Sequence, residues 1–488
     1  MTNHETILIP KAEYLELIQA KNLVPILKYE LLELKRLIYG TKSERFVPSD
    51  PNQYKLFDLP QEQAVEKQQE QITYARNKKE DKKQPQRLEL PAHLPRVEEV
   101  IEPENLPEDA RKIGEAVTEV LDYQPANVHV RRIVRPKYII ASNDEQTQIV
   151  IADLPTMPIP KGNAGPGILA HILISKFVDH LPFYRQVQMF KRQDLTIAES
   201  TLGGWFNASC RLLEPLYDTL KKQILSSAYL QGDETPIAVL SKDKPGSTHK
   251  GYHWVYYDPI NKLVLFDYRP GRGREGPDSL LADYQGYLQT DGYTAYDNLK
   301  NKDKTSHLAC MAHARRKFEH ARENDPQRAE KALMMFGKLY DVEREAREKN
   351  LQTEEIRLLR EEKSLPVLKE IESWFREEIA RVLPASAIGK AFAYTLKLWP
   401  RLIRYVDEGY LQIDNNLVEN SIRPVALGRK NYLFAGSHDA ARQAAMLYSL
   451  LAICKINNVE PFAWLKQTLQ IIPDHPANKL HNLLPGQL

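Results

Sequence analysis

Three acidic residues in predicted regular elements constrain the fold of this chain more than any other feature. Asp233 lies in LQGDETPIAVL and Asp291 in YLQTDGYTAYDNL, and each lies within or just after an apolar, strand-like run. Glu419 lies in IDNNLVENSIRP, in the first turn of a predicted helix. The segment between Asp291 and Glu419 is long enough to hold a helical insertion. The pattern therefore predicts two aspartates on neighbouring strands and a glutamate on a helix.

This arrangement is typical of one kind of catalytic chemistry. An RNase H-like core gathers two aspartates and a glutamate as ligands for a pair of divalent metals, which hold the attacking and leaving oxygens of a phosphodiester. Mg²⁺, or Mn²⁺ in its place, suits such oxygen ligands. Taken singly, each acid also has an ordinary explanation, as a turn or strand-end aspartate or as part of a capping box with Asn416. We predict that Asp233, Asp291 and Glu419 are catalytic residues and ligands of two metals per site.

Composition narrows the class of protein. With 488 residues the chain is expected to form several domains, and its 42% apolar and 27% charged content is ordinary for a globular protein. No apolar run approaches the ~20 residues of a membrane span, and the N-terminus lacks the features of a secretory signal. No membrane association is therefore expected. The three cysteines, Cys210, Cys310 and Cys454, are widely spaced, which argues against a disulfide framework and favours a reducing cytoplasm. The net charge of +2 does not by itself indicate a nucleic-acid partner.

The N-terminal third contains a helix, a polar linker and a β-rich stretch. Val24, Leu27, Leu31, Leu34 and Ile38 repeat at intervals of three and four, which predicts either a short coiled-coil dimer or a helix packed on its own domain. The Gln-, Glu- and Lys-rich stretch that follows has too little apolar surface to order itself fully. Two β-like runs follow, VHVRRIVRPKYII and TQIVIADLP. The first contains a basic cluster that is either a solvated strand face or a phosphate contact; it comprises Arg131, Arg132, Arg135 and Lys137.

The spacing of apolar residues divides the rest of the chain into predicted helices and strands. Two short helices, a tight turn and a third helix give a helix-turn-helix outline, and a β hairpin, YHWVYYDP and KLVLFDYRP, follows the strand of Asp233. We predict a multidomain α+β protein with these segments: an N-terminal helix or short coiled coil (1–46), a polar, partly disordered linker (47–91), a small β-containing module (92–160), a helix-turn-helix-like DNA-binding region (161–225), the first part of an RNase H-like α/β catalytic core (226–325), a helical insertion (326–408), the second part of the core with Glu419 and a β-like NYLFAG (409–440), and C-terminal helices (441–488).

Several blocks of sequence resemble the insertion sequence 66 family of transposases. They are GTKSERF, LPAHLPR, GDETPI, TDGYTAYDNL, CMAHARRKF and IDNNLVENSIRPVALGRKNYLFAGS. The resemblance implies a transposase of the Asp-Asp-Glu class whose acids fall on Asp233, Asp291 and Glu419. The family carries a cysteine-based zinc module after LPAHLPR, but the matching stretch of this chain holds no cysteine, so no zinc is expected.

Residues near the acids are predicted to support them or to bind DNA. Asn415 and Asn416 are expected to cap the helix of Glu419, and Arg423 lies on the same helix face as Glu419. His313 is expected either to position or protonate a leaving 3′-oxygen or to make a structural hydrogen bond. Basic residues expected to contact DNA are Arg315, Arg316, Arg429 and Lys430.

The sequence therefore predicts a transposase that cleaves the ends of an insertion element and joins their 3′-hydroxyls to target DNA. Its partners would be the terminal inverted repeats and target DNA, and it would form at least a dimer on DNA. Whether accessory proteins of the same element take part is left open. Two alternatives are a catalytically silent, transposase-derived DNA-binding regulator and a stand-alone RNase H-like nuclease or resolvase.

Overall fold

The computed structural model describes residues 137–141, 147–151, 156–160, 162–241, 246–297 and 304–487. The predicted N-terminal helix, the linker and the basic residues Arg131, Arg132 and Arg135 lie outside these ranges. Residues 137–151 belong to one compact unit and the described residues from 156 onward to another. In the first unit, β1 (Lys137–Ala141) pairs antiparallel with β2 (Thr147–Ile151), as the β-like runs predict, and Lys137 opens β1.

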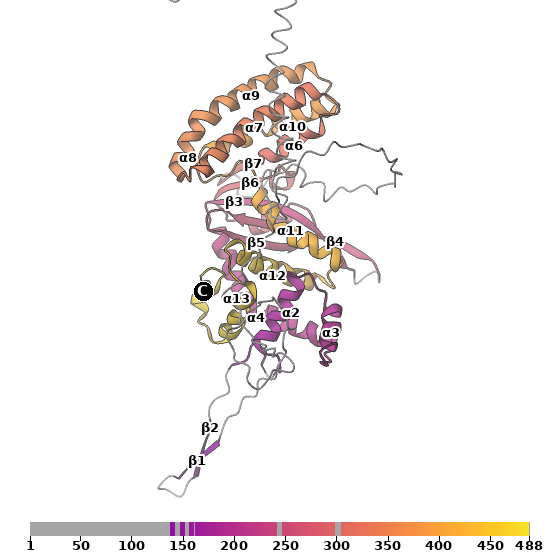
Figure 1. Ribbon diagram of the computed structural model, residues 1–488, viewed down its shortest axis with the longest axis vertical. Coiled ribbons are helices and arrows are strands. Elements are labelled where there is room, and N and C mark those ends of the chain that lie inside the picture. Colours follow the sequence, from indigo (N-terminus) through magenta and orange to yellow (C-terminus); the bar gives the residue numbers. More distant parts are fainter. Residues whose placement is uncertain are drawn as a thin grey trace, which may run out of the picture. The chain divides into compact units, whose positions relative to one another are not determined.

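A five-stranded mixed sheet lies at the centre of the second unit (Figure 1). Its order is β5-β4-β3-β6-β7, in which β3, β4 and β5 are antiparallel neighbours, as the predicted hairpin requires, and β6 and β7 run parallel to β3. β5 is a continuous buried run because both of its faces are covered. The strands are β3 (Tyr229–Leu240), β4 (Thr248–Asp258), β5 (Leu263–Arg269), β6 (Gly286–Thr290) and β7 (Thr305–Ala309).

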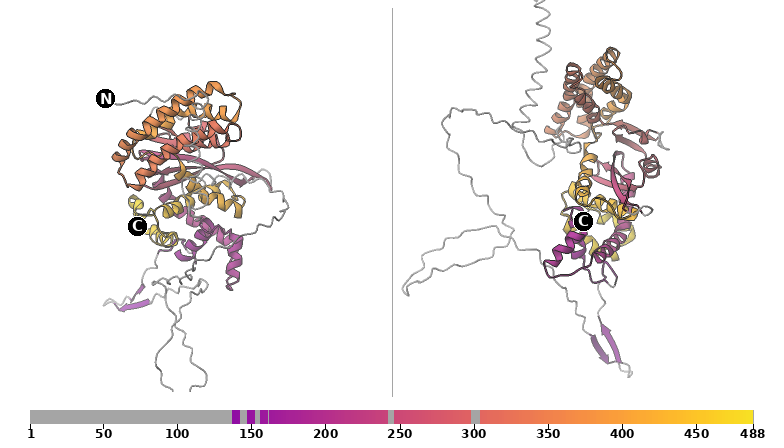
Figure 2. Two further views of the ribbon diagram at one scale, coloured as in Figure 1. Left: turned by 45° about the horizontal axis from the view of Figure 1, so that its top comes forward. Right: turned by 90° about the vertical axis from the view of Figure 1, so that its right-hand side faces the viewer.

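Helices lie on both sides of this sheet. Helices of the predicted insertion contact β7, whereas α4 and α12 contact β5 (Figures 1 and 2). The helices are α2 (Pro166–Phe177), α3 (Phe183–Lys191), α4 (Glu199–Leu225), α5 (Glu275–Leu280), α6 (Met311–His320), α7 (Pro326–Glu348), α8 (Thr353–Leu359), α9 (Leu365–Glu378), α10 (Ala387–Leu402), α11 (Asn416–Asn431), α12 (His438–Ile456) and α13 (Pro461–Ile471), with a π-helical segment, η3 (Arg360–Ser364), and short 3₁₀ helices η2 (Thr294–Tyr296), η4 (Ile379–Arg381), η5 (Ile403–Val406), η6 (Ile472–Asp474) and η7 (Ala477–Leu483). Within the described residues, no helix is long and apolar enough to cross a membrane.

The first three described helices, α2, α3 and α4, lie where the helix-turn-helix-like region is predicted, and they share the core of the sheet. Ile172, Phe190 and Leu202 make a small core between α2, α3 and the start of α4. Further along α4, apolar residues at intervals of three and four enter the main core; they are Leu213, Leu216, Leu220 and Ile224. One long helix therefore runs from the turn into the body that carries the acids.

A second core, in which aromatic rings are prominent, joins the helices of the insertion to α6 and β7. Phe318 of α6 packs against Phe336, Phe375 and Phe392, whose ring centroids lie 5.0–5.7 Å away. The segment that links this helical group to α11 is held by Arg360. Its buried guanidinium pairs with Glu343 and donates hydrogen bonds to three backbone carbonyls, those of Tyr405, Glu408 and Leu411.

One predicted strand is absent from the described structure. NYLFAG does not form a strand; the chain leaves α11 and makes a single parallel bridge between Ala435 and Val239 of β3. The helix extends to Asn431, so only a short connection remains before α12 begins at His438. The aromatic and leucine side chains of this motif therefore lie in a turn and not in a strand.

Gly292, directly after Asp291, gives a test of the fold. Its φ is +88°, and an added Cβ would lie 2.7 Å from Leu398 Cδ1 of α10. Gly292→Ala should lower the free energy of unfolding by about 2 kcal/mol or more, because it combines left-handed strain with overpacking. Urea denaturation would measure this change.

Gly203→Ala is the matched control, since Gly203 lies within α4 and nothing stands within 4 Å of its added Cβ. It should be neutral or stabilise the protein by up to ~1 kcal/mol. Equal stability of the two variants would contradict this account of the turn.

Candidate active site

The sheet places Asp233 and Asp291 side by side. β3 and β6 are parallel neighbours whose register pairs Gln231 with Gln289. Each aspartate lies two residues beyond its paired glutamine, Asp233 within β3 and Asp291 as the first residue after β6. Neighbouring strands are ~4.8 Å apart, and side chains two residues apart share a face. The side chains of the two aspartates thus project from the same face of the sheet, at the same level on adjacent strands.

Glu419 approaches them from the first turn of α11. Burial raises the pKa of Asp233 well above its ordinary value, and repulsion from Glu419 and Asp291 adds to that rise. Burial likewise raises the pKa of Glu419 to about 7; the positive charge of Arg316 opposes this rise and nearby acids reinforce it. The three predicted acids are therefore within electrostatic reach of one another.

The acids nevertheless do not form a closed ligand set. Across the described residues, no group of three His, Cys, Asp or Glu side chains is arranged so that it could hold a metal ion. Asp233 Oδ1 accepts a hydrogen bond from Glu234 N at 2.8 Å, and Asp291 Oδ1 accepts one from Tyr293 N at 2.8 Å. Glu419 Oε1 is buried and accepts no hydrogen bond from the described chain. The cluster is thus a set of close but separately held carboxylates.

His313 is the side chain that faces the unsatisfied oxygen of Glu419. Its Nδ1 lies 3.7 Å from Glu419 Oε1, and it projects from α6, which follows β7. Burial lowers the pKa of His313 to about 3, and the charges of Arg316 and Lys317 add to this effect. The imidazole is therefore neutral near pH 7 and forms no ion pair with Glu419.

A buried amide network holds the start of α11 against the two aspartate strands. Gln231 donates from Nε2 to the Asp414 carbonyl at 2.9 Å and accepts at Oε1 from Val418 N at 3.3 Å. Gln289 donates from Nε2 to the Gln412 carbonyl at 2.8 Å. Both glutamines are fully buried. They share faces with Asp233 and Asp291, so the same strands that carry two acids also fix the segment that carries the third.

Tyr229 joins the two glutamines to each other. Its hydroxyl donates to Gln289 Oε1 at 2.5 Å and accepts from Gln231 Nε2 at 3.1 Å and from Gln412 N at 3.3 Å. Burial of so many amide groups is tolerated because they satisfy one another. The insertion contributes as well, since Tyr394 of α10 donates a hydrogen bond to the Asp291 carbonyl at 2.7 Å.

Comparison with known protein families decides what kind of protein carries this site. The model described as "Transposase IS66 family" matches residues 161–443, which include all three acids. The models "Transposase C of IS166 homeodomain" and "IS66 C-terminal element" match residues 26–98 and 449–485. The chain belongs to the IS66 family of transposases.

Similar proteins are known from Sinorhizobium fredii. The uncharacterized protein y4jD is 32% identical, over 96% of this chain and 95% of its own length. The uncharacterized protein y4qI is also 32% identical, over 95% of this chain and 88% of its own length. This similarity extends the family relationship to nearly the whole chain.

The predicted supporting residues of the transposase occupy different environments. Asn416 is the first residue of α11 and is buried, and Arg423 is partly exposed one turn beyond Glu419. The predicted capping by Asn415 is wrong, because its side chain makes no capping hydrogen bond. Gln231 bonds the Val418 N–H and the Asp414 carboxylate accepts from Asn416 N at 3.2 Å, so other groups satisfy the helix start.

The predicted DNA-binding residues also differ in exposure. Arg315 and Arg316 lie on α6 and are partly exposed; Arg315 approaches Glu319 at 3.8 Å. Arg429 is partly buried, and its guanidinium donates to the Pro236 carbonyl. Lys430 is exposed. Arg429 thus stabilises the junction of α11 and β3, whereas Lys430 faces solvent.

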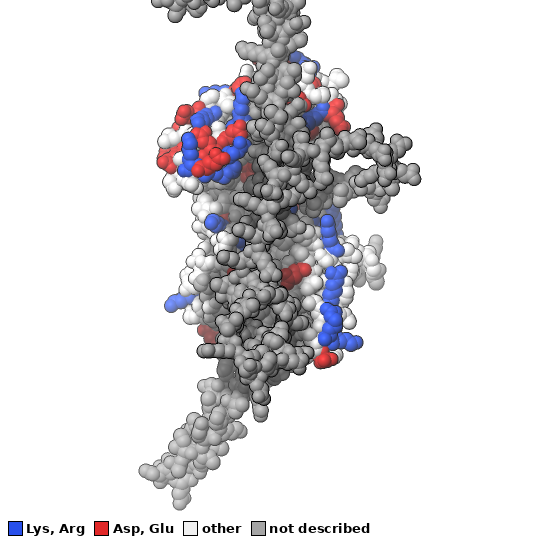
Figure 3. Space-filling model, in the orientation of Figure 1, with Lys and Arg blue, Asp and Glu red and all other residues white. Residues whose placement is uncertain are grey.

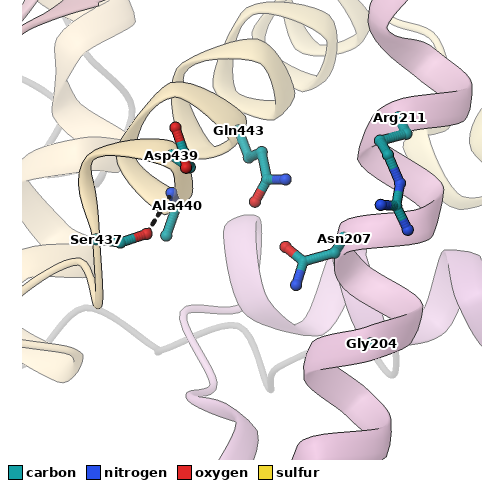
Figure 4. Close-up of a pocket in the computed structure, with 7 residues that line it drawn as sticks. All are labelled: Gly204, Asn207, Arg211, Ser437, Asp439, Ala440 and Gln443. Carbon is teal, nitrogen blue, oxygen red and sulfur yellow. Dashed lines mark hydrogen bonds between the residues drawn. The ribbon is translucent and has the colours of Figure 1, made fainter.

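A cavity of about 400 Å³ lies between α4 and the start of α12 (Figure 4). The side chains of Asn207 and Arg211 project from α4 beside it, and Ser437 caps α12 by accepting a hydrogen bond from Ala440 N at 3.1 Å. The three acids do not line this cavity, which is bounded by Gly204, Asn207, Arg211, Ser437, Asp439, Ala440 and Gln443. It is therefore separate from the candidate active site.

The amide network predicts that Gln231 is needed for the position of α11. Gln231→Leu should lower the free energy of unfolding by about 1–3 kcal/mol, because the Asp414 carbonyl and the Val418 N–H lose a buried partner. Urea denaturation monitored by circular dichroism would measure the loss. Gln188→Leu, on the exposed face of α3, is the control and should change stability by less than ~0.5 kcal/mol.

Proposed function

We propose that this protein cleaves the ends of its insertion element and joins the freed 3′-hydroxyls to target DNA, using two divalent metals, Mg²⁺ or Mn²⁺. The observation that carries the proposal is the placement of Asp233 and Asp291 on adjacent parallel strands with Glu419 in electrostatic reach. The chain belongs to a transposase family, which implies that its substrate is DNA. The acids are the catalytic residues of this proposal.

The topology of the sheet supports an RNase H-like core. Three antiparallel strands come first in the chain, and two further strands run parallel to the first of them on its other side. The second aspartate follows the fourth strand, and the glutamate returns on a helix after an insertion. This is the order expected of an RNase H-like catalytic core with a helical insertion between its second and third acids.

The residues present fit a hard divalent cation in their chemistry. The donors are carboxylate oxygens, which Mg²⁺ prefers, and one of them, Glu419 Oε1, is buried without a hydrogen bond within the described chain. Burial raises the pKa values of Asp233 and Glu419 and repulsion from nearby acids adds to the rise; a bound cation would oppose both effects. When bound, a metal pair supplies an activated water and charge neutralisation at the phosphate. No zinc is proposed.

The remaining groups orient the substrate and the acids. His313, held neutral, contacts Glu419 without competing as a cation, and Arg316 offers positive charge beside it. We place recognition of the element ends in residues 93–225, which include α2 to α4. We assign pairing of two subunits on DNA to the N-terminal helix that the sequence predicts, with Leu31 and Leu34 in its predicted seam. The cytoplasm is the proposed location.

Substitution of Asp291 tests the chemistry. Asp291→Asn keeps the shape of the side chain but removes an anionic ligand, so cleavage and strand transfer should fall by at least ~10³-fold while DNA binding is retained. A labelled duplex that ends in the inverted repeat flanking the gene, incubated with Mg²⁺, would show both steps.

Asp283→Asn is the matched control, because Asp283 is exposed before β6 and should keep full activity. Undiminished cleavage by Asp291→Asn would show that the acids are misassigned. Cleavage by the unaltered protein without any strand transfer would instead indicate a nuclease.

A further inference from the structure

Two consecutive apolar side chains stand exposed in the connection between α11 and α12. Leu433 is 71% exposed and Phe434 is 45% exposed. Of the nine large apolar or aromatic side chains exposed among the described residues, four come from α3, α11 and this connection: Tyr184, Leu427, Leu433 and Phe434. Such clustering of exposed apolar groups marks a surface that contacts a partner.

The backbone presents these side chains rigidly. Ala435 N donates to the Ala238 carbonyl at 2.8 Å, and the Ala435 carbonyl accepts from Leu240 N at 2.9 Å. On the other side of the pair, the Tyr432 and Tyr448 hydroxyls are hydrogen-bonded. Leu433 and Phe434 are therefore anchored on both sides, and their exposure is a feature of the fold.

Positive charge surrounds the pair. Lys430 is exposed three residues before Leu433, and Arg185 of α3 donates to Asn431 Oδ1 at 3.1 Å, which brings α3 against the end of α11. Lys191 and Arg192 extend the basic row to the end of α3. Figure 3 shows a row of Lys and Arg side chains over this side of the molecule. The surface thus complements a polyanion.

One face of α11 connects this exposed surface to the candidate active site. Glu419, Arg423, Leu427 and Lys430 follow one another along a single face of α11. Asn431 lies twelve residues beyond Glu419, or about 18 Å along the helix. Along β3, Ala238 lies five residues beyond Asp233, or about 17 Å. Both routes place the exposed pair roughly five base steps from the acids, at ~3.4 Å per step.

We propose that Leu433 and Phe434 form an apolar wedge that inserts between bases of the DNA substrate, about five base steps from the phosphate held by the acids. The inference rests on the proposed function, since the DNA that reaches the acids along α11 is the DNA that meets the wedge. Lys430 and Arg185 hold the phosphates on either side. The wedge unstacks one step and so fixes the register of the strand at the acids.

Fluorescence of 2-aminopurine tests the wedge without requiring chemistry. Full-length protein in a chelator is mixed with duplexes that end in the flanking inverted repeat. Each duplex carries one 2-aminopurine at a position from about three to eight nucleotides from the cleavage point. The unaltered protein should raise the fluorescence at one or two neighbouring positions. The Leu433→Ala, Phe434→Ala double variant should abolish that rise and bind the duplex about tenfold more weakly.

A mismatched base pair, placed at the base step where the fluorescence rises, supplies the second readout. Because a mismatched step costs less to unstack, it should restore most of the lost binding of the double variant. Lys430→Ala should instead weaken binding to paired and mismatched duplexes alike. It should also make the plot of the logarithm of the binding constant against the logarithm of salt concentration less steep by about one unit. The control Leu358→Ala, Leu383→Ala removes two side chains that are 51% and 77% exposed elsewhere and should change neither signal.

Two outcomes would overturn the wedge. One is an unchanged fluorescence rise in the double variant. The other is a change in the solution mass of the protein–DNA complex with no fluorescence effect, which would assign the patch to a second copy of the chain. Failure of the proposed function is distinguishable, because it would appear as full cleavage by Asp291→Asn and leaves the metal-free fluorescence readout intact.

Discussion

The candidate site depends on the pair of buried amides contributed by Gln231 and Gln289. Glu419 is separated from the aspartates by the whole helical insertion, so no local feature of the chain can place it. The amides solve this problem because each can donate and accept, and together they bond the backbone at Gln412, Asp414 and Val418. These three backbone groups are two carbonyls and one N–H, so side chains that only accept or only donate would have left at least one of them unsatisfied in a buried setting.

The insertion completes this arrangement from the other side. Arg360 fixes the backbone from Tyr405 to Leu411, just before the segment that the glutamines hold. Its charge is buried but paired with Glu343, and its remaining donors meet carbonyls, which is the condition under which a buried arginine is tolerated. Together with the contact of Tyr394 to Asp291, this makes the insertion part of the support of the acids.

Much of this could be read from the sequence, for physical reasons that can be named. The strands of Asp233 and Asp291, the hairpin of β4 and β5 and the helices of the insertion follow from periodicity, and these predictions agree with the structure. The amide network was missed, although both strands carry the same L-Q-x-D pattern. A glutamine two residues before an acid shares its face, but only parallel pairing in register, a long-range feature, shows that the two glutamines meet. The capping role of Asn415 failed for the same reason, because a distant side chain satisfies the helix start.

The register of β3 against β6 has a consequence for how such chains can vary in length. Glutamine and aspartate share a face only while their spacing is two, so adding or deleting one residue in either strand would send the acid to the opposite side of the sheet. Between β7 and α11 the requirement is different, because only the segment from Gln412 to Val418 must reach the amides. Relatives can therefore gain or lose whole helical turns in the insertion, far from Arg360, while the spacing from glutamine to aspartate in β3 and at the end of β6 tolerates no added or deleted residue.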